Sequence, residues 1–203
     1  MIATKELATM DMIDRQFESH RIQRHQLDAS GRWFIRGGGI EAGSASDAER
    51  SAVATIATER PVPAYDRRSG RIVDEILLMR GGQFPKWAPL LEAHQTWSMY
   101  SVLGSVHSTS RSGRVARGRF EFARDDEHVE QIWRKVRDGH IRGVSVGGQR
   151  ASWVDIQPGE SATVFGRRFT AGRERPLRVT TSWLMREASI VIFPADIDSG
   201  VNG

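Results

Sequence analysis

The clearest hydrophobic pattern in the chain lies in residues 125–138. Its apolar residues recur at spacings of three and four positions: Val129, Ile132, Trp133 and Val136. This spacing places them on one face of a helix. Two aspartates open the segment, where exposed backbone N–H groups favour negative charge, and Gly139 follows its end. We predict a helix over residues 125–138 with this apolar face buried.

Most of the chain after Val53 has a different pattern, with short apolar segments interrupted by Gly, Pro, Asp and Arg. Such punctuation is typical of the strands of a compact barrel or sandwich. The strands that we expect are residues 72–79, 99–106, 118–122, 143–147, 152–156, 177–181 and 188–193. The expected fold class is therefore α+β and mainly β, a small closed or partly open β-barrel with a few flanking helices.

The part of the chain before Val53 has less regular patterning. Residues 1–28 carry apolar residues at helical spacing, namely Leu7, Met10, Ile13 and Phe17. Residues 33–35 are apolar and run into three glycines, and residues 41–52 are small and polar. We expect residues 1–52 to form an N-terminal arm, helical in part and flexible, and residues 53–203 to form the barrel domain. Docking of this arm on a partner and packing on its own domain are both left open.

Composition excludes several kinds of chemistry. The chain has 203 residues and no cysteine, which excludes disulfides, thiolate nucleophiles and Cys-ligated zinc. The spacing of His, Asp and Glu matches no metal motif, and we expect neither a metal nor a cofactor. No apolar run approaches the roughly 20 residues that span a bilayer. We therefore expect no membrane partner and a protein that acts in the cytoplasm or in something assembled there.

Charge adds one feature. The formal net charge is +4, and arginines gather in residues 111–124 and again in residues 167–178. Such clusters attract nucleic acid or acidic protein surfaces. We interpret them as solvated faces, and keep a basic nucleic-acid-binding barrel as an alternative.

Ser145 and His94 are the candidate catalytic pair. Ser145 stands between two valines and among glycines, and strand alternation places its side chain on the face opposite both valines. A serine hydroxyl becomes a useful nucleophile when a neighbouring base takes its proton. His94 follows the apolar residues 88–93, which bring it to the end of a strand, and imidazole is the natural base for a serine.

Glu187 is the candidate third member of a triad. It directly precedes the apolar residues 188–193, and a carboxylate there can orient an imidazole and stabilise it when protonated. An ion pair with Arg186 or another arginine is the alternative that the pattern leaves open.

Three segments, taken in order, resemble the tailed-phage prohead protease family, whose barrel is related to that of the herpesvirus capsid assembly proteases. The first is PAYDRRSGRIV (63–73) followed by PLLEAH (89–94), the second is the predicted helix running into GHIRGVSVG (139–147), and the third is REASIVIFPA (186–195). The resemblance covers residues 53–198. Gln95 stands where the family often has aspartate, and residues 148–182 are longer than usual.

This resemblance implies a herpesvirus-protease-like fold and a role for each candidate. It implies that His94 is the general base, Ser145 the nucleophile and Glu187 the residue that orients His94. His107 is the alternative third member, because related capsid proteases can use a second histidine. The oxyanion donors are expected to be backbone N–H groups near Gly147 and Gly148 or a nearby arginine.

The implied function is that of a prohead serine endopeptidase, which cleaves the scaffold segment of the phage capsid protein and the chain itself during head assembly. Its implied partners are the capsid protein and other copies of the chain, through autoprocessing or a homo-oligomer. The implied location is the host cytoplasm, inside the prohead. A catalytically inactive barrel that binds capsid or scaffold protein is the main alternative.

Overall fold

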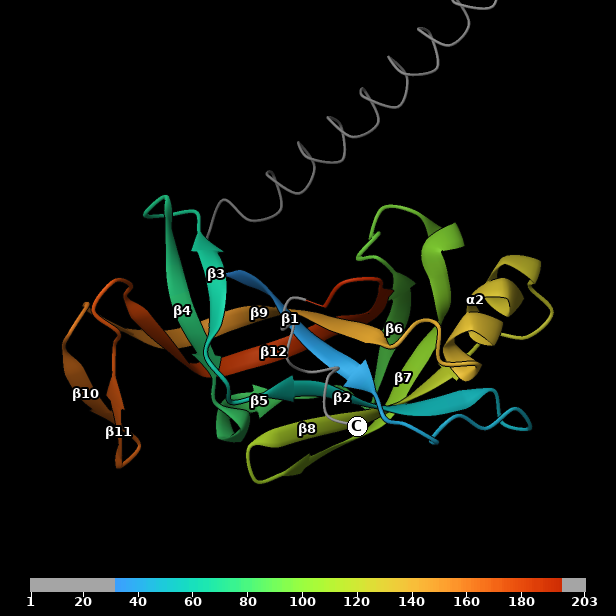
Figure 1. Ribbon diagram of the computed structural model, residues 1–203, viewed down its shortest axis with the longest axis horizontal. Helices are drawn as coiled ribbons and strands as arrows, with labels where there is room; N and C mark the ends of the chain where they lie inside the picture. The colour runs from blue at the N-terminus through green and yellow to red at the C-terminus, as the bar shows by residue number, and fades with distance from the viewer. Residues whose placement is uncertain (1–31, 195–203) are drawn as a thin grey trace, which may run out of the picture.

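The computed structural model describes residues 32–194, and these are mainly β-strands (Figure 1). The strands are β1 (Trp33–Ile40), β2 (Ser51–Thr58), β3 (Val62–Asp66), β4 (Arg71–Leu77), β5 (Gly82–Gln83), β6 (Trp87–Glu92), β7 (Val102–Ser112), β8 (Val115–Phe122), β9 (Gly143–Ile156), β10 (Ser161–Val164), β11 (Arg167–Thr170) and β12 (Leu177–Val191). Within this part of the chain there is one α-helix, α2 (Glu127–Arg137), with short 3-10 turns η1 (Met79–Gly81) and η2 (Met99–Ser101).

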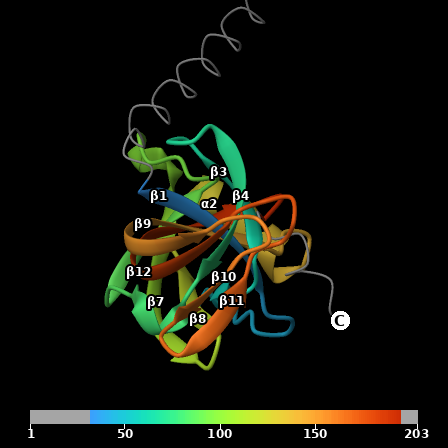
Figure 2. The ribbon, with the colours of Figure 1, turned by 90° about the vertical axis from the view of Figure 1, so that its left-hand side faces the viewer.

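Seven of the strands close into a barrel. They follow the order β12, β6, β7, β8, β2, β1 and β9, and β9 pairs back onto β12. β3 and β4 form a hairpin beside the first half of β12, and β10 and β11 form a separate hairpin at one end of the molecule (Figures 1 and 2). The prediction of a small, mainly β barrel is confirmed. One helix, rather than a few, flanks it in the described residues.

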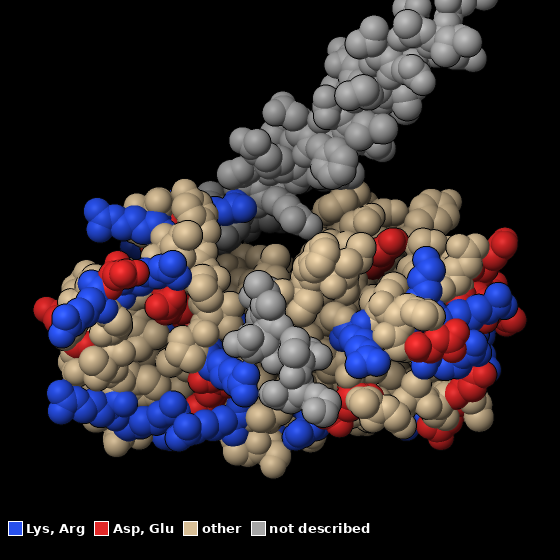
Figure 3. All heavy atoms as spheres, in the orientation of Figure 1, with Lys and Arg blue, Asp and Glu red and all other residues tan. Residues whose placement is uncertain are grey.

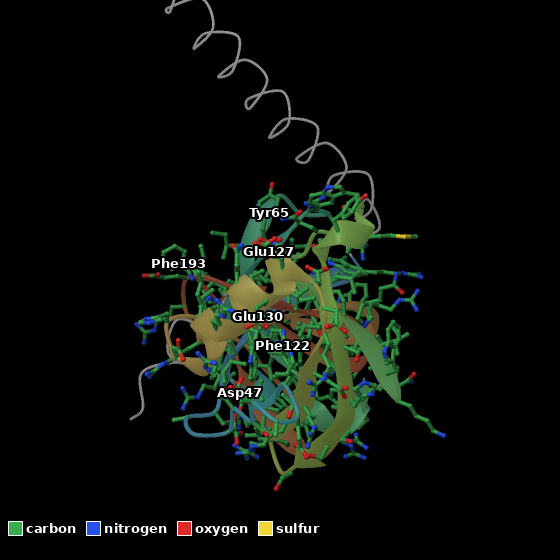
Figure 4. All side chains as sticks on the ribbon, turned by 90° about the vertical axis from the view of Figure 1, so that its right-hand side faces the viewer. Asp47, Tyr65, Phe122, Glu127, Glu130 and Phe193 are labelled. Carbon is green, nitrogen blue, oxygen red and sulfur yellow. The ribbon has the colours of Figure 1, made fainter. Side chains whose placement is uncertain are left out.

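The barrel interior is filled by alternate residues of the strands. On β9 and β12 these are Val144, Val146, Ala188 and Ile190, all in one core with side chains from the other strands. α2 closes one end of this core with the four apolar residues that define its predicted face. The helix begins where the Asp126 side chain accepts the backbone N–H of Val129 (3.1 Å). Figure 4 looks onto this end and labels Glu127 and Glu130 on α2 and Phe122 in the strand that it covers.

The glycine run in β1 allows this strand to enter the barrel wall. A Cβ atom at Gly38 would lie 2.0 Å from the carbonyl oxygen of Thr55 on β2, closer than any side chain allows. β1 pairs with β2 on one side and with β9 on the other. The expected arm over residues 1–52 therefore differs from the structure, which places β1 and the start of β2 in the barrel. Residues 1–31 and 195–203, with the expected N-terminal helix, lie outside the described residues.

Other strand predictions differ in extent. Residues 143–147 and 152–156 belong to one continuous strand, β9, and residues 177–181 lie with most of 188–193 in another, β12. β7 begins at Val102, after the η2 turn that occupies the expected start at residue 99. None of the helices in residues 32–194 has the length and apolar content needed to span a membrane.

Candidate active site

The register of β9 against β12 brings three polar side chains to one face of the barrel wall. Ser145 lies opposite Ser189, and Gly147 lies opposite Glu187. Residues paired directly across two strands point to the same face, and residues two positions apart along a strand do so too. Since the intervening residues Val146 and Ala188 fill the core, Ser145, Ser189 and Glu187 lie on the outer face.

His94 reaches this face from the turn that follows β6. Ala93 and His94 both have left-handed backbone conformations, with φ of 47° and 61°, which are uncommon and costly for residues other than glycine. The His94 backbone N–H donates to the Ser189 hydroxyl (3.0 Å), which holds this turn against β12. The imidazole Nδ1 then lies 2.8 Å from Glu187 Oε1. The strained backbone of this turn thus places the His94 imidazole against the Glu187 carboxylate.

The Glu187 carboxylate is fixed at both oxygens. Oε1 contacts His94, and Oε2 accepts a hydrogen bond from the Ser189 hydroxyl (2.8 Å). Gly147 supplies the space, since a Cβ atom there would lie only 1.8 Å from Oε1. In the neutral tautomer whose Nδ1–H donates to this carboxylate, Nε2 is the acceptor. Nε2 is buried and has no hydrogen-bond partner among the described residues.

Ser145 lies on the strand beside this pair but is not joined to it. Its side chain is fully buried, with 0% exposure, and its hydroxyl donates to the backbone carbonyl of Arg36 on β1 (3.2 Å). No hydrogen bond connects Ser145 with His94 in the described part of the chain. The structure therefore brings His94 and Glu187 into direct contact, and leaves Ser145 on the adjacent strand in a different hydrogen bond.

The remaining sequence candidates lie elsewhere or are otherwise engaged. His107 is on β7, where its Nε2 lies 2.7 Å from the Ser105 hydroxyl, and Glu187 rather than His107 contacts His94. Gly147 and Gly148 lie within β9, which pairs with β1 and β12 at both positions. Their backbone groups are thus inside the barrel wall and not at a free strand end where an oxyanion could bind. Within residues 32–194, no three His, Asp or Glu side chains are grouped to hold a metal ion.

Ser189 is the site residue that the sequence analysis missed. Its single hydroxyl accepts from the His94 backbone N–H and donates to the Glu187 carboxylate. It therefore holds in place the two residues that form the histidine–carboxylate pair. The available signal was the Glu-x-Ser spacing, because in a strand two residues separated by one lie on the same face.

Replacing Ser189 with alanine is expected to leave the His94 N–H and one Glu187 oxygen without this partner, at a cost of about 1–3 kcal/mol in unfolding free energy. If the pair catalyses the self-cleavage that the resemblance implies, misplacement of the imidazole should also slow that reaction roughly tenfold to hundredfold. Urea denaturation and intact-mass time courses measure the two effects. Ser105→Ala is the control, since it likewise removes a hydroxyl that contacts a histidine. Self-cleavage at the wild-type rate in Ser189→Ala would limit Ser189 to a structural role.

Comparison with known proteins adds nothing to this geometry. A scan against protein-family models finds no match, and neither curated proteins nor solved structures contain a match to the chain. The interpretation of the site depends on its residues and their arrangement.

Proposed function

We propose that the chain is a serine endopeptidase of the tailed-phage prohead maturation type, with Ser145 as nucleophile, His94 as base and Glu187 as the carboxylate that orients His94. The observation that carries the proposal is the 2.8 Å contact between Glu187 Oε1 and His94 Nδ1. This contact fixes the tautomer in which Nε2 can take a proton, as in a serine triad. The sequence resemblance adds the capsid scaffold segment and the chain itself as substrates.

The proposed reaction is acyl transfer. The Ser145 oxygen attacks a peptide carbonyl while its proton passes to His94 Nε2, and the resulting imidazolium is stabilised by Glu187. Collapse of the tetrahedral intermediate breaks the C–N bond, and His94 returns the proton to the leaving amine. Water then hydrolyses the acyl-enzyme by the same sequence of transfers. Proton transfer by a positioned base contributes on the order of 10²–10⁴-fold to such a reaction.

The described arrangement is a resting one, and two changes would make it reactive. The Ser145 hydroxyl must exchange the Arg36 carbonyl for His94 Nε2, which costs one neutral hydrogen bond. The serine must also become accessible, because it has no exposed surface. Both features suit a peptidase whose activity waits until it meets its substrate in an assembling particle.

A non-enzymatic barrel that binds capsid or scaffold protein is the second candidate. It is favoured by one observation, the hydrogen bond from Ser145 to the Arg36 carbonyl in place of one to His94. In that case the His94, Glu187 and Ser189 contacts serve only to fasten the turn after β6 to β12.

Covalent labelling distinguishes the two candidates. We expect a fluorophosphonate probe to form an adduct on Ser145 when the chain is co-expressed with the capsid protein of the same genome, and to form less on the isolated chain. Peptide mapping by mass spectrometry locates the adduct. His94→Gln should lose the adduct, because the base is gone. Absence of an adduct on Ser145 in both settings, or equal labelling of His94→Gln, would favour the binding barrel.

A further inference from the structure

An open basic pocket lies away from the candidate active site and shares no residue with it. Its volume is about 710 Å³, and it lies between the η1 turn, the turn from β7 to β8 and the hairpin of β10 and β11. Its charged lining consists of Glu59, Arg80, Arg111, Arg114 and Arg167. Figure 3 shows Lys and Arg side chains along this lower left part of the molecule. The fold thus brings arginines from both clusters of the sequence, 111–124 and 167–178, to one pocket.

The base of the pocket is held by internal contacts. Glu59 accepts the Met79 backbone N–H (2.9 Å) with one oxygen and Arg167 (2.5 Å) with the other. Arg111 donates to the backbone carbonyls of Met79 (2.9 Å) and Arg80 (3.2 Å). These contacts occupy Glu59, the one carboxylate that residues 32–194 contribute to the lining, and fix Arg111 in place.

Two arginines of the pocket retain free binding capacity. Arg80 forms no ion pair with any described carboxylate, and its guanidinium lies over the Phe165 ring at 4.2 Å from the centroid. Arg114 is 69% exposed, and its nearest carboxylate oxygen, on Glu59, is 3.8 Å away and already bonded to Arg167. A guanidinium stacked on a ring keeps its N–H groups available at its edge. Both side chains can therefore donate to an anion that enters the pocket.

Phe165 is an unusual residue for its place at the tip of the β10 and β11 hairpin. Phe165 and Gly166 connect the two strands, with φ of 52° and 78°. Turns of this kind normally contain Asn or Gly, because a bulky residue at positive φ is strained. The ring is also 55% exposed, so burial does not compensate for the strain. Backbone strain kept at a half-exposed aromatic residue is typical of a binding residue.

We propose that this pocket binds an acidic peptide segment, with carboxylates on Arg80 and Arg114 and an apolar side chain against Phe165. Guanidinium groups match carboxylates by paired, charge-assisted hydrogen bonds. Nucleic acid fits less well, since Phe169 is buried beneath Arg167 (4.5 Å) and Phe165 is the one exposed ring among the described residues of the lining, whereas stacking along a strand uses several rings for successive bases. The proposal does not depend on the peptidase activity, and it holds equally for a binding barrel.

Fluorescence anisotropy with defined probes tests the proposal on the full chain. A labelled peptide of alternating Glu and Leu residues should bind, and the matching Gln and Leu peptide should bind at least about tenfold more weakly. The double variant Arg80→Gln, Arg114→Gln should lower affinity for the acidic peptide by roughly tenfold or more. Arg134→Gln is the matched control, because Arg134 is similarly exposed on α2 at the other end of the molecule (Figure 1).

The variant Phe165→Asn gives a second test, because it should change stability and peptide binding in opposite directions. Relief of the strained turn should raise Tm by about 2–4 °C, whereas loss of the ring should weaken binding of the Glu and Leu peptide. Equal binding of the acidic and amide peptides, or unchanged binding by the double arginine variant, would overturn the proposal. So would tighter binding of labelled oligothymidylate that is lost in the double variant, since it would assign the pocket to nucleic acid.

Discussion

Replacing Ser145 with alanine is expected to lower the rate of the proposed peptide cleavage by roughly 10⁴–10⁶-fold, the effect of removing the nucleophile from a serine triad. The fold should survive the change. The only hydrogen bond that the Ser145 hydroxyl makes in the described structure is to the Arg36 carbonyl, at 3.2 Å, and such a neutral bond contributes about 1 kcal/mol. Loss of this one oxygen atom also leaves only a very small void in the barrel wall. Activity and stability should therefore separate cleanly in this variant.

Intact mass of the chain and of co-expressed capsid protein measures the loss, and urea denaturation measures the fold. Ser152→Ala is the control, because Ser152 is an exposed serine on the same strand, with its hydroxyl on Thr181. We expect wild-type cleavage from Ser152→Ala and none from Ser145→Ala. Cleavage that persists in a folded Ser145→Ala protein would remove Ser145 from the mechanism and, with it, the proposed peptidase.

The elements that the sequence predicts best are those set by local pattern. The helix expected at 125–138 is present as α2, because its apolar stripe, its Asp126 cap and the glycine that follows its end are all neighbours in the sequence. β9 and β12 were each expected as two pieces. Register shifts between Thr180 and Ser182 and between Met185 and Glu187 interrupt the period of two on β12, so periodicity alone could not join its halves.

Closure of the barrel depends on pairing between distant segments and could not be predicted locally. β1 closes the wall by pairing with β9 as well as with β2, as in Gly37 opposite Ser145, more than a hundred positions along the chain. The same applies to the hydrogen bond from Ser145 to Arg36. The resemblance implied that Glu187 orients His94, whereas the resting partner of Ser145 depends on which strand closes the barrel beside it.

The basic pocket shows the same limit. The two arginine clusters were interpreted as solvated faces, since nothing in the sequence places the β7 to β8 turn against the tip of the β10 and β11 hairpin. One local signal was present. A phenylalanine before glycine in a two-residue turn departs from the Asn-Gly that such turns favour, and the departure marks Phe165.

A buried charge cluster connects the candidate site with the stability of the barrel. Glu75 on β4 has no exposed surface and accepts hydrogen bonds from Arg150 (2.5 and 2.8 Å), Arg36 (3.0 Å) and Thr180 (2.7 Å). These partners lie on β9, β1 and β12, so one carboxylate links four strands. The same Arg36 whose side chain is held here supplies the carbonyl that binds Ser145.

The acid dependence of stability should report this cluster. Burial alone would raise the pKa of Glu75, but hydrogen bonds from Arg150 and the charges of Arg36 and Arg150 outweigh it, and the pKa lies below its ordinary value of 4.5. A carboxyl with a lowered pKa stabilises the fold fully above the pKa of the unfolded chain. That contribution is lost as the pH falls below about 4.5 towards the lower pKa of the folded protein.

Glu75→Gln is therefore expected to lower the unfolding free energy at pH 7 by about 3–5 kcal/mol, because two buried guanidinium groups lose their counter-charge. The difference from wild type should shrink as the pH falls below 4.5. In that range the unfolded wild-type chain binds a proton at Glu75 that the folded protein does not, and this lowers the stability of the wild type. Urea denaturation at pH 7 and at lower pH measures both. Glu160→Gln, at an exposed loop position, should change neither value. A Glu75→Gln deficit that is small at pH 7, or constant across this range, would show that the cluster is not a source of stability.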